Sequence, residues 1–142
     1  MLKKDNAAAL FKCYTDFLDA KGFGYEKTPE AGQLVLSVKG EDCLVRLLVV
    51  VDEASEQTLV YSPLPFEVQR ERIMDLVMAV GCINVRLAVG KFFIDAERGD
   101  CVYTAHHPFS GLSGFDEAYA GQVIFTAFNV VEMYGDKLFA VS

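Results

Sequence analysis

Two adjacent histidines, His106 and His107, are the residues of this chain that most invite a chemical role. Neighbouring residues of a β-strand point to opposite faces of the sheet, so the two imidazoles cannot readily bind one metal ion. The sequence also has no Cys-x-x-Cys or His-x-x-x-His spacing, the patterns that supply paired metal ligands. We therefore interpret the pair as the end of a strand or part of a loop, and we predict no metal site.

Cys101 is a second candidate, because His106 could act as its base and Asp95 could orient the imidazole. However, Cys101 lies in an apolar stretch that is typical of a buried strand, where a thiol is usually inert packing. The carboxylates Asp52 and Glu53 lie in a polar turn, which favours a solvated charge cluster over a catalytic pair. No glycine loop with the context of a phosphate site is present. We predict no catalytic residue and no cofactor.

Composition indicates a single globular domain spanning residues 1–142. Hydrophobic residues make up 52% of the chain, which argues against disorder, and no apolar run reaches the length of a membrane span. The formal net charge of −7 repels phosphate backbones and anionic lipid, so we expect neither nucleic acid nor membrane as a partner. A polypeptide with basic or apolar segments is the better match. The first residues do not resemble a secretory signal, which predicts a cytoplasmic protein.

The four cysteines, Cys13, Cys43, Cys82 and Cys101, are widely spaced and have apolar neighbours. In a chain without an export signal, free thiols are far more common than disulfides. We expect all four to be reduced and most of them to be buried.

Hydrophobic periodicity predicts an N-terminal helix followed by an antiparallel meander. Apolar residues at helical spacing cover residues 5–21, and Gly22 is expected to end this helix as a C-terminal cap. Alternation over residues 34–39, an almost continuous apolar run over 43–51 and a short segment 57–61 predict three strands. Because the links between them are short, we expect consecutive strands to pair.

The next segments predict a second helix and a hairpin. Residues 65–81 form the helix, because proline suits a first helical turn and Gly81 can end it. Residues 83–104 follow as two strands joined by a tight turn. Apolar residues alternate before Gly90 and continue on the opposite parity after it, so we expect a β-bulge or a sharp strand bend there.

The last helix, capped by Ser113 or Gly114 and ending near Tyr134, is apolar around most of its circumference. One sheet covers only one side of such a helix. The other side requires either a subunit partner or the C-terminal tail, residues 137–141, folded over it. We expect a homodimer, since a symmetric dimer is the commonest way for identical chains to bury an apolar patch.

Five side chains are predicted to contact a partner polypeptide. Met74 and Met78 lie beside the apolar stripe of the second helix, where they form either the edge of the core or an adaptable surface. Phe93 marks an interface if the sheet is covered on one side only. Phe125 and Phe128 belong to the apolar last helix.

About twenty positions of the hairpin region resemble the pattern of the YbjN-like family of bacterial sensory transduction regulators. The matching residues are Ile83, Asn84, Leu87, Val89, Gly90, Phe92, Ile94, Asp95, Gly99, Val102 and Tyr103. The resemblance implies the fold of type III secretion chaperones, which are small, acidic, dimeric proteins that bind segments of other proteins. It also implies that the first and last helices share one face of the sheet, with the second helix set apart. The family pattern contains no catalytic residues.

These observations predict a two-layer α+β domain of order α-β-β-β-α-β-β-α with a five-stranded antiparallel sheet. The predicted function is a non-enzymatic interaction or chaperone-like module that binds another polypeptide through apolar surface. The competing hypothesis is a regulator that binds a small molecule in a pocket between the sheet and the last helix. An enzyme is the third hypothesis.

Overall fold

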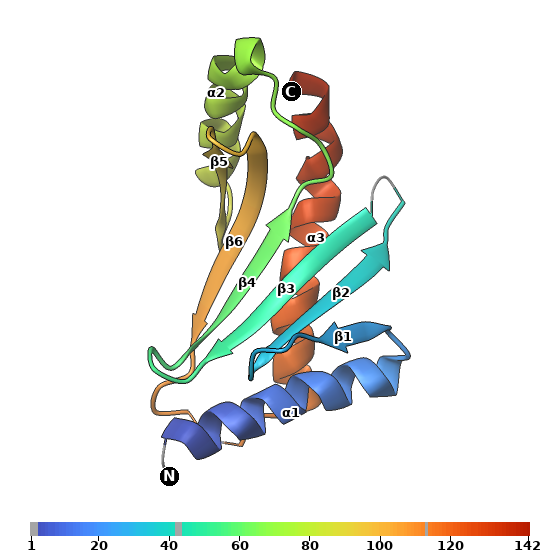
Figure 1. Cartoon of the computed structure of the whole chain (residues 1–142), viewed down its shortest axis with the longest axis vertical. Helices are drawn as coiled ribbons and strands as arrows, with labels where there is room; N and C mark the ends of the chain where they lie inside the picture. Colours follow the sequence, from blue (N-terminus) through green and yellow to red (C-terminus); the bar gives the residue numbers. More distant parts are fainter. Residues whose placement is uncertain (1–2, 42–43, 113) are drawn as a thin grey trace.

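The computed structural model describes residues 3–41, 44–112 and 114–142, and within them three helices cover one six-stranded antiparallel sheet (Figure 1). The elements are α1 (Lys3–Lys21), β1 (Tyr25–Lys27), β2 (Gln33–Lys39), β3 (Leu44–Asp52), β4 (Gln57–Pro63), a 3-10 turn η1 (Arg70–Arg72), α2 (Ile73–Asn84), β5 (Lys91–Asp95), β6 (Asp100–Pro108) and α3 (Glu117–Val141). The strand order is β1-β2-β3-β4-β6-β5. The predicted two-layer α+β class is confirmed, with one strand more than expected.

The extra strand is β1, which pairs with β2 at the edge of the sheet. It contains only Tyr25, Glu26 and Lys27, which is too short and too polar to give a strand pattern in the sequence. Tertiary pairing alone therefore defines it. The sheet is open, and its two edge strands are β1 and β5.

Helices α1 and α3 pack on the same face of the sheet, as the family resemblance implied (Figure 1). Alternate residues of the central strands, such as Leu36, Leu47 and Val60, are fully buried beneath them. The hydroxyl of the buried Tyr14 on α1 donates to Thr58 Oγ1 of β4 at 3.0 Å, which fixes the helix against the sheet. Helix α2 lies far from α1, beside β5 and the C-terminal part of α3.

The predicted end of α1 is confirmed at Gly22, whose φ is 74°. The Gly22 amide donates to the carbonyl of Asp19, and the Phe23 amide donates to Leu18, so the last carbonyls of the helix are satisfied. A left-handed residue at this position favours glycine.

The predicted hairpin is wrong in its first half. Helix α2 runs through Gly81 to Asn84, residues 85–90 form a loop, and β5 begins only at Lys91. No bulge forms at Gly90, because no strand precedes it. The alternation of Val85 with its neighbours does not mark a buried face, since Val85 is 83% exposed.

Side chains of the family pattern hold this loop against the sheet. Asn84 Oδ1 accepts from the Phe92 amide at 2.8 Å, and Asn84 Nδ2 donates to the Phe92 carbonyl at 3.0 Å. The side-chain amide of Asn84 therefore takes the place of a neighbouring strand at the free edge of β5. At the other end of the loop, the Tyr103 hydroxyl donates to the Val89 carbonyl at 2.8 Å. Gly90 (φ 80°) fits beside it only because it has no side chain.

The boundaries of α2 and α3 also differ from the expectation. The chain bends at residues 65–66 and stays non-helical to residue 69, with the Val68 amide donating to the Gly99 carbonyl at 2.7 Å, so no helix starts at Pro65. Helix α3 continues to Val141, and therefore the tail 137–141 does not fold back over it. Its N-cap is Asp116, whose carboxylate accepts from the Tyr119 amide at 2.9 Å.

The predicted cap Ser113 lies outside the described residues, as does Cys43. The other three cysteines are free. Cys101 is buried and Cys13 is half-buried, whereas Cys82 is exposed on α2. The expectation of burial is therefore wrong for Cys82, because α2 exposes apolar residues on one side. No helix in the described part of the chain is long and apolar enough to cross a membrane.

Candidate functional site: an apolar groove and an exposed helix face

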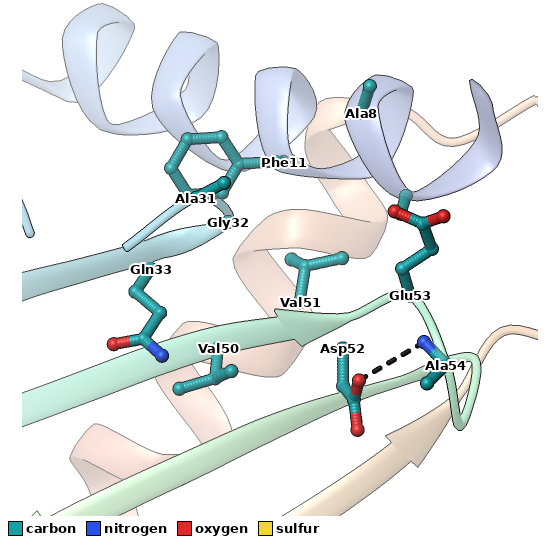
Figure 2. A pocket seen from close by; sticks show the side chains of 11 residues that line it. Ala8, Phe11, Ala31, Gly32, Gln33, Val50, Val51, Asp52, Glu53 and Ala54 are labelled. Atoms are coloured by element: carbon teal, nitrogen blue, oxygen red, sulfur yellow. Dashed lines mark hydrogen bonds between the residues drawn. The ribbon is translucent and has the colours of Figure 1, made fainter. Parts of the chain in front are cut away.

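An apolar groove of about 710 Å³ separates the first half of α1 from the neighbouring ends of β2 and β3 (Figure 2). Its walls are formed largely by small or branched apolar side chains. They are Ala7, Ala8 and Phe11 of α1, Ala31 and Gly32 before β2, and Val50 and Val51 of β3. Alanines on the helix leave the space open, because a larger side chain there would reach the sheet. We name these residues, with Gln33, Asp52, Glu53 and Ala54, the α1 groove.

Gly32 shapes the floor of the α1 groove. Its φ is 77°, and a Cβ at this position would lie 2.9 Å from the Val51 carbonyl oxygen. The Val51 amide donates to the Gly32 carbonyl at 2.8 Å. The loop before β2 therefore lies directly against β3, which holds Ala31 opposite α1.

The rim of the α1 groove is acidic. Glu53 extends from the turn after β3 toward α1, whereas Asp52 points away from the helix (Figure 2). Asp52 accepts from Ser55 Oγ at 2.6 Å and from the Ala54 amide at 3.1 Å. The Ser55 hydrogen bond is the main cause that lowers the pKa of Asp52, so its carboxylate is ionised at neutral pH. No lysine or arginine is among the described residues that line the groove.

Helix α2 presents a second apolar surface. Met74 and Met78 are 71% and 69% exposed, and Val77 and Val85 are also exposed. The opposite side of the helix is buried through Leu76 and Val80, so α2 is apolar on both sides. We name Met74, Val77, Met78, Cys82 and Val85 the α2 face.

Two contacts connect the segment just before α2 to the end of α3. Arg72 Nε donates to the Val141 carbonyl at 3.1 Å, and the ring of Phe66 meets that of Phe139 edge-on at 5.7 Å. These contacts join the start of α2 to the end of α3.

The five side chains predicted to contact a partner lie on three different elements. Met74 and Met78 are exposed together on α2, and Phe93 is 38% exposed on β5. Phe125 on α3 is 37% exposed and packs edge-on against the rings of Phe17 and Phe23. Phe128 is partly buried against the core. None of the five lines the α1 groove.

The sequence interpretation missed the α1 groove. It assigned Asp52 and Glu53 to a solvated turn and gave no role to the alanines of the first helix. The signal that could have found it was the pair Ala7-Ala8, since small residues on a helix face that meets a sheet leave space there.

The residues considered for catalysis are not arranged for it. Burial raises the pKa of Cys101 to about 12, so its sulfur is a protonated thiol at neutral pH and a poor nucleophile. His106 is exposed, whereas its neighbour His107 is half-buried, in keeping with opposite faces of β6. In the parts of the chain that the structure describes, no three metal-ligating side chains cluster.

Solved structures with the same fold include two complexes. The chain is 15% identical to YbjN from E. coli, with a TM-score of 0.67 over 89% of this chain and 88% of that one. It is 11% identical to a chain of the ExsC–ExsE complex (TM-score 0.64, 93% and 95% covered). It is 12% identical to a chain of the HopA1–SchA chaperone–effector complex (TM-score 0.60, 91% and 96% covered). At these identities the likeness shows the fold alone.

The comparison with curated proteins gave no match. The model of one protein family, described as "putative bacterial sensory transduction regulator", matches residues 15–139. This match spans most of the chain, from the middle of α1 almost to the end of α3. It includes the Asn84 and Tyr103 contacts that hold the loop before β5. The chain therefore belongs to the YbjN family.

Proposed function

We propose that this protein is a non-enzymatic regulatory module that binds a segment of another polypeptide in the α1 groove. The observation that supports this most directly is an open apolar groove whose described lining residues include the carboxylates of Asp52 and Glu53 and no lysine or arginine, although Lys27 Nζ lies 5.9 Å from the centroid of the Phe11 ring. Apolar walls favour aliphatic side chains, and the acidic rim favours a lysine or arginine next to them. The occupant would thus be an extended segment with a basic residue beside apolar ones.

Two of the structures with this fold support the proposal as analogies. One is a chain of the ExsC–ExsE complex, and another is a chain of a chaperone–effector complex. Each of those chains is assembled with another protein, which is the class of partner that the α1 groove fits.

The experiment is a fluorescence-anisotropy titration with two short labelled peptides. Both alternate leucine with serine, and they end either in two lysines or in two glutamates. We expect the lysine peptide to bind more tightly than the glutamate peptide, by roughly twofold to fivefold for a partly exposed ion pair. Replacement of Glu53 by lysine should reverse this order. Equal affinity of both peptides for both proteins would contradict the role of the acidic rim.

We further propose that the protein is a homodimer whose subunits meet through the α2 face. Even 300 Å² of apolar surface per subunit, an assumed area, would contribute roughly 7–8 kcal/mol before association entropy is subtracted. The exposed Met74 and Met78 suit such a contact, because methionine side chains adapt to the opposing surface. The apolar composition of α3 had favoured this helix as the subunit contact, but the sheet and α1 bury much of its surface.

Sedimentation equilibrium of two matched variants tests the dimer. Met78→Glu places a charge in the α2 face, whereas Met133→Glu places one on α3, where Met133 is also well exposed. We expect M78E to be monomeric and M133E to remain dimeric. If the unmodified chain is monomeric at the highest concentrations, or if M133E alone dissociates, the assignment fails.

We place the protein in the cytoplasm as part of the same proposal. The three described cysteines are free, including the exposed Cys82, which is typical of a reducing compartment. The competing hypothesis of a small-molecule regulator is supported by one observation, a smaller cavity between β6 and α3.

A further inference from the structure

Lys27 stands beside the α1 groove, although it is not one of the residues that line it. It is the last residue of β1 and pairs with Leu34, which is fully buried on the helix-covered face of the sheet. Because directly paired residues of neighbouring strands share one face, the Lys27 side chain lies on the same face as α1. Its Nζ atom is 5.9 Å from the centroid of the Phe11 ring, within the range of a cation–π contact.

The charge of Lys27 is available to a ligand of the groove. The residue is exposed, and the ion pairs among the described residues involve Lys12 and Arg72 instead. An aromatic ring attracts the ammonium group but does not neutralise its charge. Since Phe11 is part of the groove wall, we name Lys27 the basic end of the α1 groove.

The two carboxylates nearest to Lys27 in the sequence lie on the other side of the sheet. Glu26 is its neighbour on β1 and therefore points to the opposite face. Glu30 Oε2 accepts from Gln33 Nε2 at 3.0 Å, and Figure 2 shows Gln33 pointing away from α1. Neither carboxylate shares the helix-covered face with the ammonium group.

Glu53 forms the acidic end of the α1 groove. Its side chain extends toward α1 near Ala8, whereas Phe11 lies about one helical turn further along the helix (Figure 2). Asp52 lines the groove as well, but its carboxylate points away from α1. On the side of the helix, the groove thus has one acidic and one basic end.

Strand pairing gives the distance between the two ends. Lys27 pairs with Leu34, and Leu34 pairs with Val49, which lies two strands away from Lys27 and precedes Glu53 along β3. With strands about 4.8 Å apart and a rise of about 3.3 Å per residue, the Cα atoms of Lys27 and Glu53 are roughly 16 Å apart. An extended segment spans this distance in about five residues.

We propose that the α1 groove selects a polypeptide segment by a pair of opposite charges, with a basic side chain at Glu53, an acidic side chain at Lys27 and apolar residues between them. This inference rests on the proposed function and adds to it the acidic residue and a spacing of about four to six residues between the two charges. A segment with basic residues at both ends meets a like charge at Lys27, which disfavours it.

The test is a fluorescence-anisotropy titration at about 0.15 M ionic strength, where long-range attraction by the net charge of the protein is screened. Four labelled peptides with blocked termini share the core Ser-Leu-Ser-Leu-Ser and carry lysine or glutamate at each end, in all four combinations. We expect the tighter of the two mixed peptides to bind the unmodified protein roughly twofold to fivefold more tightly than either like-charged peptide.

Charge reversal at each end should change the preferred peptide. Lys27→Glu should make the dilysine peptide the tightest ligand, and Glu53→Lys should do the same for the diglutamate peptide. The double variant has the net charge of the unmodified protein and should prefer a mixed peptide again. Glu97→Lys is the matched control, because Glu97 is an exposed turn residue between β5 and β6, away from the groove (Figure 1). It should leave the order of affinities unchanged.

The outcomes separate this inference from the proposed function. If no peptide gives saturable binding, the proposed function fails and the inference fails with it. If the peptides bind but the dilysine peptide is as tight as the mixed ones, or K27E leaves the order unchanged, the inference alone is overturned. Should K27E not fold, Lys27→Met decides, because it removes the charge and keeps an aliphatic side chain beside Phe11. The dilysine and mixed peptides should then bind equally, and a retained preference for a mixed peptide overturns the inference.

Discussion

Replacement of Gly90 by alanine should destabilise the protein through two separable effects. Gly90 has a φ of 80°, where an alanine is strained by roughly 1–2 kcal/mol. Its new Cβ would also lie 2.6 Å from the Thr104 carbonyl oxygen and still closer to the Tyr103 hydroxyl. Thr104 pairs with Lys91 in the β5–β6 ladder, so its carbonyl cannot move freely. We expect this overpacking to add about 1–3 kcal/mol.

Two other glycines provide matched controls. Gly111 has a φ of 77°, and a Cβ added to it would have no atom within 4 Å, so Gly111→Ala should show the backbone strain alone. Gly24 has neither feature, and Gly24→Ala should be close to neutral. The expected order of destabilisation is therefore Gly90, then Gly111, then Gly24. Urea denaturation at one fixed protein concentration measures it, because a constant slope permits comparison of midpoints.

A double variant isolates the hydroxyl contact. Tyr103→Phe alone loses the hydrogen bond to the Val89 carbonyl, which should reduce stability by about 1 kcal/mol. In the Gly90→Ala background the same change also removes one of the crowding atoms. The two substitutions should therefore destabilise less together than the sum of their separate effects. If G90A is no more destabilising than G111A, the packing argument for this loop is refuted.

The remaining predictions concern the edge of the sheet and the thiols. Asn84→Ala should reduce the free energy of unfolding by roughly 1–3 kcal/mol, because the Phe92 amide and carbonyl lose their partner. Size-exclusion chromatography should also detect aggregation through the uncovered β5 edge, and a stable, fully soluble N84A protein would contradict the role of Asn84. In thiol titration of the native protein, the exposed Cys82 should react rapidly, while Cys101, with its pKa raised to about 12, should react only on unfolding. Fast reaction of Cys101 would show that β6 opens readily.

The sequence pattern predicted the helices and strands correctly where a single hydrophobic periodicity dominates a segment. The spacing of apolar residues in α1 and the glycine after it predicted the helix and its end. Alternation predicted β2, and an almost continuous apolar run predicted β3. The pattern failed at residues 85–89, where the apolar alternation belongs to a loop. The reason is the Asn84 side chain, which takes the place of a strand partner for Phe92. Hydrophobic periodicity cannot predict a hydrogen bond between one polar side chain and the backbone of a strand.

The candidate surfaces were predictable only in part. The positions of Met74 and Met78 beside the apolar stripe of α2 left open whether they form the edge of the core or an adaptable surface, and both are exposed. The α1 groove could not be read from periodicity, because its walls come from α1, from the loop at Gly32 and from β3. Their approach depends on a tertiary contact between Gly32 and Val51.

The most direct test of the proposed function is blockage of the α1 groove by a single side chain. Ala8 and Ala9 are adjacent, exposed alanines of α1, but only Ala8 lines the groove. Ala8→Trp should fill the groove and weaken binding of the lysine peptide by at least about tenfold, equivalent to about 1.4 kcal/mol. Ala9→Trp should leave its affinity unchanged in the same anisotropy assay. Equal affinity of both tryptophan variants for the peptide would show that polypeptide binding, if present, takes place elsewhere on the molecule.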